Sequence, residues 1–169
     1  MKKRTVLFEG RPVEVVGPAL RLQDAAPGNF TVTANDMSEV RGTAIAGRLR
    51  VICSVLSLDT AVCDTEMKHF TRDVMELPNA ELYAISMDLP FAQRRWCAAT
   101  GNERVRALSD FKNRSFGSAY GVLCPDLGLL VRAVFVVGRD DEIHHVQYVD
   151  EATSEPNYAA ALAALHAVY

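Results

Sequence analysis

One stretch of the chain decides the fold: residues 50–77, which read RVICSVLSLDTAVCDTEMKHFTRDVMEL. Its first part, Arg50 to Leu56, is an almost unbroken apolar run, which is typical of a strand buried on both faces of a parallel or mixed sheet. After Ala61 the apolar residues recur at intervals of three and four and predict one face of a helix, formed by Met67, Phe70, Val74 and Leu77. Cys63 falls on the same face, so we predict that its sulfur lies in the first helical turn and points toward the sheet.

The segments on either side of this unit predict an α/β fold. We expect a second strand over residues 81–87 and a second helix from Pro90, with Asp88 placed to cap it and Cys97 about two turns along it. The other expected elements are a hairpin over residues 5–16 that turns at 9–12, a strand at 30–33, two paired strands at 129–137 and 143–149, and a helix at 158–168. The resulting order, a hairpin followed by β-α-β-α-β-β-α, is the one that a thioredoxin-like core with a central mixed sheet flanked by helices requires.

Length and composition narrow the class of protein. At 169 residues the chain suits a single domain over residues 1–169, with the hairpin as an N-terminal addition. The net charge is −3 and like charges form no long block, so no nucleic-acid partner is expected. No apolar run is long enough for a signal peptide or a membrane span, and we therefore expect a cytoplasmic protein that does not associate with membranes. Thiols stay reduced in the cytoplasm, which favours reactive rather than bridging roles for the four cysteines.

The residues around Cys63 suggest thiol chemistry. Helix N-termini and neighbouring cations lower the pKa of a thiol to about 3.5–7.5 and so make it a nucleophile at neutral pH. Arg132 interrupts the apolar run 129–137, where a lone cation is costly unless it meets an anion; a thiolate at Cys63 and a structural carboxylate are the two candidate partners. Thr60, three residues before Cys63, can either cap the helix or hold a substrate oxygen beside the sulfur. Cys97 is either a functional partner of Cys63 or a small core residue.

Several blocks of sequence carry a resemblance to a known family. They read Asp59-Thr60-x-x-Cys63, Asp88-Leu89-Pro90-Phe91-Ala92-Gln93 leading to Cys97, Leu108-Ser109-Asp110-Phe111, Ala119-Tyr120-Gly121-Val122, Gly128-Leu129-x-x-Arg132-Ala133-Val134-Phe135-Val136, and Val149-Asp150-Glu151 with Glu155-Pro156-x-Tyr158. Together these blocks resemble the bacterial thiol peroxidases, which are the atypical two-cysteine peroxiredoxins. The match runs over nearly the whole chain, and the Leu-Pro-Phe-Ala-Gln block with the spacing of the two cysteines is its most specific part.

The resemblance implies a catalytic residue set and a reaction cycle. Cys63 is the peroxidatic cysteine, whose thiolate attacks hydrogen peroxide or an organic hydroperoxide, and Cys97 is the resolving cysteine of the same chain. Thr60 and Arg132 match the family's threonine and arginine, which orient the peroxide and stabilise the developing charge. The resemblance further implies that thioredoxin reduces the Cys63–Cys97 disulfide, that the protein is a homodimer, and that no cofactor or metal takes part. We expect the first turn around Cys63 and the helix bearing Cys97 to unwind during the cycle, because a disulfide needs Cα atoms within about 7 Å.

One residue departs from the family pattern. Leu56 stands where the peroxiredoxins have a proline four residues before Thr60. Proline fixes its φ and has no N–H, whereas leucine keeps an apolar cover but loosens the backbone and adds a donor. We therefore expect a slower peroxidase, and the alternative function is a peroxide sensor or interaction module with slow turnover.

The other cysteines and the histidines receive minor roles. We interpret Cys53 as a packing residue in its strand and expect Cys124, before Pro125 in a loop, to be exposed and open to oxidation. A third function, a cysteine hydrolase with His144 or His145 as base, leaves the cysteine pair unexplained. Those two histidines are adjacent on a strand, so they point to opposite faces and cannot bind one metal together.

Overall fold

A computed structural model of the chain describes residues 3–101 and 104–169. Its strands, in chain order, are β1 (Lys3–Phe8), β2 (Arg11–Val16), β3 (Thr31–Thr33), β4 (Glu39–Arg41), β5 (Leu49–Ser54), β6 (Ala80–Ser86), β7 (Val105–Ser109), β8 (Leu123–Cys124), β9 (Leu129–Leu130), β10 (Ala133–Val137) and β11 (Ile143–Tyr148). The α-helices are α1 (Ala61–Met75), α2 (Pro90–Thr100), α3 (Ser115–Ala119) and α4 (Tyr158–Val168), and a 3-10 turn, η1, covers Gly42–Ile45.

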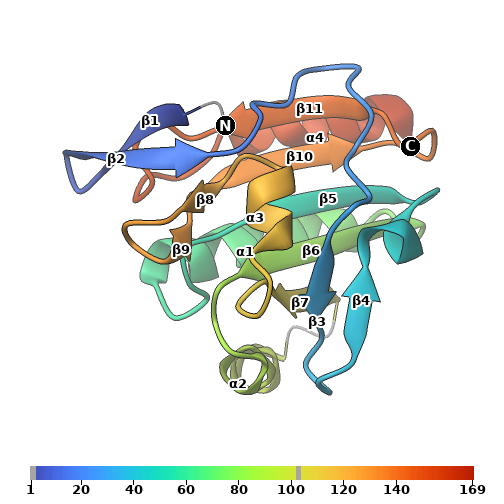
Figure 1. Ribbon diagram of the computed structural model, residues 1–169. Helices are drawn as coiled ribbons and strands as arrows, with labels where there is room; N and C mark the ends of the chain where they lie inside the picture. The colour runs from blue at the N-terminus through green and yellow to red at the C-terminus, as the bar shows by residue number, and fades with distance from the viewer. Residues whose placement is uncertain (1–2, 102–103) are drawn as a thin grey trace.

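A mixed sheet forms the centre of the molecule (Figure 1). Within the described residues it has seven strands in the order β11-β10-β5-β6-β7-β3-β4. β5 lies between antiparallel β10 and parallel β6, and all of its residues are buried. The strand predicted from the apolar run at 50–56 is therefore confirmed, as is its place inside a mixed sheet.

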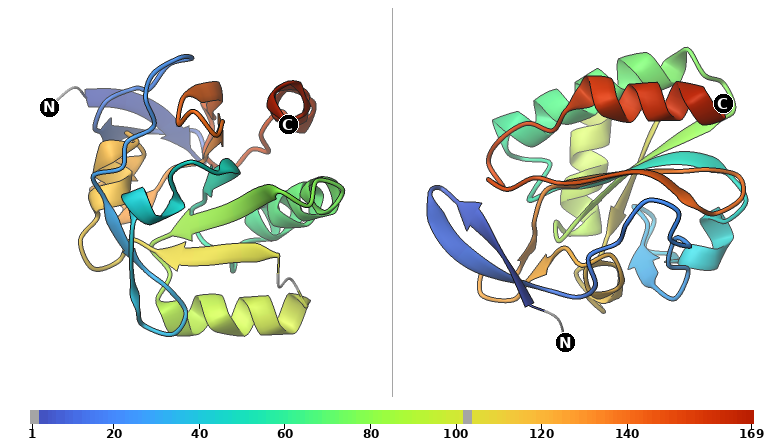
Figure 2. Two further views of the ribbon diagram at one scale, coloured as in Figure 1. Left: turned by 90° about the vertical axis from the view of Figure 1, so that its right-hand side faces the viewer. Right: turned by 90° about the horizontal axis from the view of Figure 1, so that it is seen from above.

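Helices cover the sheet on one face. α1 and α4 lie next to each other there, while α3 and the N-terminal hairpin lie on the opposite side, and α2 packs against β7 near the end of the sheet (Figure 2). The apolar stripe of α1 is buried as its spacing predicts, since Met67, Phe70 and Val74 are each at most 2% exposed. Burial of this stripe holds the N-terminus of α1 at the end of β5, which is where Cys63 lies.

The N-terminal hairpin is confirmed, but its turn is tighter than expected and it is more than an addition. Glu9 and Gly10 form the turn with positive φ angles of 50° and 74°, while Pro12 is already paired with Leu7 inside the hairpin. β2 also pairs with β8, and β8 with β9, so the hairpin belongs to a second sheet. Arg4 extends from it over the ring of Tyr148, 3.8 Å from the centroid, and ties it to β11.

Two parts of the sequence-based fold prediction were wrong. The apolar run at 129–137 is not one strand: β9 belongs to the small sheet and β10 to the large one, and Arg132 lies in the connection between them. The third parallel strand of the core is β7, which pairs with β6 and which the predicted order left out. The described part of the chain contains no helix that is both long enough and apolar enough to span a membrane.

Candidate active site

Cys63 lies in the first turn of α1, as predicted. The hydroxyl of Thr60 accepts a hydrogen bond from the Cys63 backbone N–H at 3.3 Å and donates one to the Ser57 carbonyl at 3.1 Å, so Thr60 is the N-cap of the helix. The Cys63 side chain is 0% exposed. The helix therefore begins at Ala61 because Thr60 ends the preceding loop, and this cap turns the sulfur inward.

Arg132 brings a cation to that sulfur. Its Nη2 lies 3.2 Å from Cys63 Sγ, its Nη1 donates to Glu66 Oε2, and its Nε donates to the Ala152 carbonyl at 3.1 Å. The side chain is only 1% exposed. The two candidate partners considered for Arg132, the sulfur and a carboxylate, are thus both present, one on each terminal nitrogen of the guanidinium.

Sequence reasoning did not find Glu66, the carboxylate in this cluster. Glu66 is 0% exposed, and burial raises its pKa to about 7 although the neighbouring Arg132 opposes that shift. Its Oε1 is buried without a hydrogen-bond partner in the described part of the chain. A signal was available, because Glu66 follows Cys63 by three residues and precedes Phe70 by four, which places an acid on the apolar face of the helix.

The charges of this cluster stabilise one another. Burial acts against the charge on Arg132, but the Glu66 carboxylate and the Cys63 sulfur outweigh it and hold the pKa of Arg132 above its usual value. Cys53, on β5 beneath them, is fully buried, and burial together with the Glu66 charge raises the pKa of its thiol well above normal. Cys53 therefore stays a neutral packing residue, as interpreted from the sequence. The sulfur that contacts the Arg132 guanidinium is that of Cys63.

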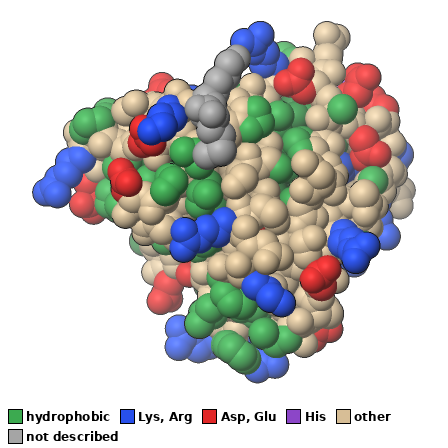
Figure 3. All heavy atoms as spheres, in the orientation of Figure 1, with side chains coloured by type: hydrophobic (Ala, Val, Ile, Leu, Met, Phe, Trp, Pro, Cys, Tyr) green, Lys and Arg blue, Asp and Glu red, His purple; other side chains and the backbone are tan. Residues whose placement is uncertain are grey.

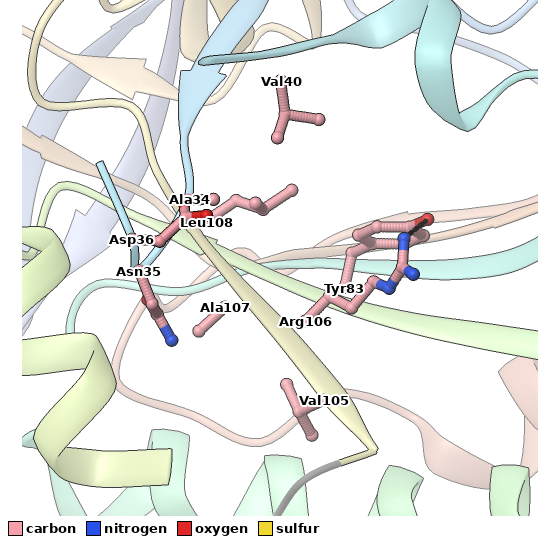
Figure 4. Close-up of a pocket in the computed structure, with 9 residues that line it drawn as sticks. All are labelled: Ala34, Asn35, Asp36, Val40, Tyr83, Val105, Arg106, Ala107 and Leu108. Atoms are coloured by element: carbon pink, nitrogen blue, oxygen red, sulfur yellow. Dashed lines mark hydrogen bonds between the residues drawn. The ribbon is translucent and has the colours of Figure 1, made fainter. Parts of the chain in front are cut away.

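Cys97 lies in a different environment. It is half-buried on α2, and the Asn35 side-chain amide donates to its Sγ at 3.8 Å. Burial raises the pKa of the Cys97 thiol, while the hydrogen bond from Asn35 acts in the opposite direction. Asn35 stands at one end of an open cavity of about 370 Å³, with Tyr83 and Arg106 toward the other end (Figure 4). All four cysteines carry free thiols, so the two predicted partners are not bonded in this structure.

Asp88 does not cap α2, contrary to the prediction. The N-cap is Leu89, which has no side-chain capping bond. The Asp88 carboxylate instead accepts hydrogen bonds from the Ser57 hydroxyl at 2.7 Å and the Leu58 N–H at 2.8 Å, and so connects the loop before Cys63 to the start of α2. Leu56, at the beginning of that loop, is 5% exposed, so its side chain is buried.

The histidines do not take part in this cluster. His144 Nε2 lies 3.0 Å from Asp140 Oδ2 next to the turn between β10 and β11, and burial lowers the pKa of His145. Asp140, Glu142 and His144 form the group of possible metal ligands in the described ranges, but Asp140 and Glu142 are exposed, and exposed acidic groups are common without a metal ion. The side chain that donates a hydrogen bond to Cys63 Sγ is that of Arg132. This contact does not favour a cysteine hydrolase, which would use a histidine as base. Cys124 is 0% exposed in β8, so the expectation that it is exposed was wrong.

Comparison with known proteins assigns the family. The model of the Redoxin family matches residues 21–162 of the chain. A thiol peroxidase of Halalkalibacterium halodurans is 45% identical over 163 residues, which is 96% of this chain and 98% of that protein. The chain belongs to the redoxins, among the thiol peroxidases. A second thiol peroxidase, from Bacillus subtilis, is 40% identical over 96% of this chain and 97% of its own length.

Solved structures show that the fold is shared with peroxiredoxins. A peroxiredoxin-like protein from Aquifex aeolicus superposes with a TM-score of 0.90 at 38% identity and covers 98% of both chains. The thiol peroxidase of Chromobacterium violaceum has a TM-score of 0.87 over 96% of this chain and 95% of its own, and at 20% identity it shows the shared fold alone. The expected thioredoxin-like fold is confirmed.

Proposed function

We propose that Cys63 is the peroxidatic cysteine of this thiol-dependent peroxidase. One observation carries the assignment: the guanidinium of Arg132 lies 3.2 Å from Cys63 Sγ, and both side chains are buried. A cation that donates to sulfur in a water-poor site favours the thiolate, which is the nucleophilic form. The same guanidinium is placed to stabilise the negative charge that develops on a peroxide oxygen during attack.

The first half of the cycle oxidises the sulfur. The Cys63 thiolate attacks the nearer oxygen of hydrogen peroxide or an organic hydroperoxide, the O–O bond breaks, and the departing oxygen takes a proton and leaves as water or an alcohol. Cys63 becomes a sulfenic acid. We assign Thr60 to hold the peroxide beside the sulfur, because its hydroxyl already lies at the first turn of α1 and bonds the Cys63 N–H.

The second half returns the enzyme to its reduced state. The Cys97 sulfur attacks the Cys63 sulfenic sulfur, an S–S bond forms, and the displaced hydroxide leaves as water with the Cys97 proton. Because Cys63 is fully buried and Cys97 lies on a separate helix, the first turn of α1 and part of α2 must unwind before the sulfurs meet. A dithiol protein then reduces the disulfide by thiol exchange.

We assign thioredoxin as that reductant, in a homodimeric protein of the cytoplasm. The half-exposed position of Cys97 supports attack by an external thiol, and the same helix carries Phe91, which is 57% exposed beside Leu89 at 50%. Hydrophobic side chains gather at the end of the molecule where α2 lies (Figure 3). Light scattering on the reduced protein tests the dimer.

A single-turnover experiment tests the cycle. Fully reduced protein is mixed with one equivalent of hydrogen peroxide in a stopped-flow fluorimeter, and the emission of Trp96, the only tryptophan of the chain, is followed. We expect a fast change that is absent from Cys63→Ser. Cys97→Ser should keep the oxidation step but lose turnover with thioredoxin, its reductase and NADPH. Oxidation of Cys63 no faster than that of an ordinary free thiol would exclude the peroxidatic role.

The peroxide sensor is the second candidate function, and the buried Leu56 favours it. A residue with a free φ and a backbone N–H replaces the family's rigid proline in the loop that leads to the active cysteine. Slow oxidation of Cys63 without thioredoxin-coupled turnover would support the sensor, whereas steady turnover of NADPH would support the enzyme.

A further inference from the structure

A hydrogen bond joins the two segments that carry the reactive cysteines. The indole Nε1–H of Trp96 donates to Asp64 Oδ1 at 3.1 Å. Asp64 directly follows Cys63 in the first turn of α1, and Trp96 directly precedes Cys97 in α2. The other carboxylate oxygen of Asp64 accepts from the Lys68 ammonium at 2.6 Å. The indole N–H therefore meets the carboxylate oxygen that the exposed Lys68 ammonium does not contact.

The segment around Cys63 and helix α2 do not pack closely against each other everywhere. A surface cavity of about 240 Å³ lies between the loop that leads to Cys63 and the partly exposed side of α2. Its lining residues are Ser57, Leu58, Asp59, Asp88, Ala92, Arg95, Trp96 and Ala99. The Trp96–Asp64 bond and the bonds from Asp88 to the loop join the two segments. Because packing is incomplete at this place, individual hydrogen bonds contribute a large part of what holds the two segments together.

We propose that the Trp96–Asp64 hydrogen bond is a latch that delays formation of the Cys63–Cys97 disulfide. This inference rests on the proposed function, in which the turn around Cys63 and the helix around Cys97 unwind before the sulfurs meet. The latch joins residues directly adjacent to both cysteines, so neither segment can unwind far while the bond is intact. Trp96 and Asp64 are thus positioning residues that act through the conformation of the chain.

The delay decides the fate of the sulfenic acid. While the latch holds, the Cys63 sulfenic acid stays folded next to Arg132 and can meet a second peroxide, which transfers an oxygen to the sulfur, leaves as water or an alcohol, and produces a sulfinic acid. When the latch opens, Cys97 displaces the hydroxyl group and the disulfide forms with release of water. The latch therefore sets the peroxide concentration at which the enzyme is inactivated.

The test uses Trp96→Phe, which removes the N–H donor but keeps an aromatic ring at that position. Reduced protein is mixed with hydrogen peroxide, the reaction is quenched at set times, and mass spectrometry separates the thiol, sulfenic, disulfide and sulfinic forms. We expect the rate of Cys63 oxidation to stay within twofold of wild type. Disulfide formation should become about three- to tenfold faster, as the loss of one ordinary, partly exposed hydrogen bond allows. The peroxide concentration that gives half sulfinic acid should rise by the same factor.

Lys68→Met is the matched control, because it removes the other partner of the Asp64 carboxylate while the indole N–H remains. It should leave the ratio of disulfide to sulfinic acid close to that of wild type. Asp64→Leu should reproduce the effect of Trp96→Phe. A purely structural role of Trp96 would change the rate of Cys63 oxidation as well, which the quench series measures separately.

Two outcomes would overturn the latch alone, and a third would overturn the proposed function together with it. Unchanged disulfide formation in Trp96→Phe would show that the bond does not limit the rearrangement. Slower disulfide formation would show that Trp96 instead presents Cys97 to the sulfenic acid. If the wild-type protein forms no Cys63–Cys97 disulfide at all, the resolving role of Cys97 fails, and the latch fails with it.

Discussion

The two cysteine sites of this protein are built in opposite ways. Cys63 is 0% exposed and receives a hydrogen bond from Arg132, which is itself paired with Glu66. Cys97 is half-buried, bonds the neutral amide of Asn35, and has a thiol pKa that burial raises. In the proposed cycle, the site that acts first is charged and tightly packed, whereas the site that moves is neutral and lies next to Trp96, which lines a cavity.

This difference teaches how one chain can separate attack from resolution. A nucleophile needs a fixed electrostatic environment at the moment of attack, because preorganised charges stabilise the transition state without reorganisation. A resolving thiol has to leave its position, so strong contacts to it would slow the cycle. Substitutions near Cys63 and substitutions near Cys97 can therefore be tested separately.

Loss of the cation at Cys63 should have the largest effect. Arg132→Met removes the guanidinium that contacts the sulfur and leaves Glu66 without its partner. By analogy with the loss of one preorganised donor, we expect the rate of peroxide reduction to fall by about 10²- to 10³-fold. Stopped-flow fluorescence of Trp96 measures the rate. Arg132→Lys keeps a positive charge, so its rate should lie between those of wild type and Arg132→Met. A loss below tenfold in Arg132→Met would mean that the helix N-terminus alone activates Cys63.

The buried carboxyl should appear in the pH dependence of stability. Burial raises the pKa of Glu66 to about 7 from an ordinary value of 4.5, so the folded protein holds this proton up to a higher pH than the unfolded chain. The contribution to stability is therefore complete below pH 4.5 and is lost as the pH rises through 7. At about 1.4 kcal/mol per pH unit, the free energy of unfolding of wild type should fall between pH 5 and 8 by up to about 3 kcal/mol more than that of Glu66→Gln.

Urea unfolding of the reduced proteins at the two pH values measures that difference. Asp110, whose pKa burial raises to about 6, titrates in both proteins and cancels in the comparison. Parallel stability curves for wild type and Glu66→Gln would mean that Glu66 stays ionised in its pair with Arg132 throughout this range.

The loop before Cys63 should show a smaller effect. Leu56→Pro restores the residue that fixes φ at the entrance to the active-site loop, and we expect the peroxide rate to increase about three- to tenfold if loop freedom limits it. Leu56→Ala serves as the control, because it removes the apolar cover without adding rigidity. No gain in Leu56→Pro would show that the leucine does not limit the reaction.

The smallest effect is expected at Cys97, the proposed resolving cysteine. Asn35→Leu keeps the side-chain volume but removes the amide that bonds Cys97, so the pKa of Cys97 should rise further. We expect alkylation of Cys97 by iodoacetamide at pH 8 to slow about twofold, as read by peptide mass spectrometry. Asp36→Ala changes the neighbouring residue and should leave the rate as it is. Faster alkylation of Asn35→Leu would mean that Asn35 shields the sulfur rather than polarising it.

Local sequence patterns predicted those helices and strands in which the spacing of the apolar residues is clear. α1 and β5 were found because the spacing of Met67, Phe70 and Val74 and the apolar run before them are strong signals. β7 was missed, since Val105–Ser109 is short and Arg106 and Ser109 interrupt its apolar character. The break between β9 and β10 was also missed, because two strands of different sheets read as one apolar run when only the sequence is seen.

The active site could be predicted only in part for a similar reason. Cys63, Thr60 and Arg132 were selected from motifs, and the N-cap role of Thr60 follows from its position relative to the helix. Their assembly depends on contacts between residues far apart in sequence, such as Arg132 with Glu66, which no local pattern encodes. Asp88 shows the same limit, because its carboxylate bonds the loop at Ser57 instead of the helix that it precedes.

The position of Arg132 between β9 and β10 has a practical consequence for handling the protein. Its backbone joins the small sheet to the large one, and its Nε is held by the Ala152 carbonyl. A slight separation of the small sheet during heating or storage would withdraw the guanidinium from Cys63 while the helices and the large sheet stay intact. If Arg132 activates Cys63 as proposed, such a preparation would retain its circular dichroism spectrum and elution volume but reduce peroxide much more slowly. Specific activity, rather than a spectroscopic measure of folding, is therefore the proper criterion for an intact sample.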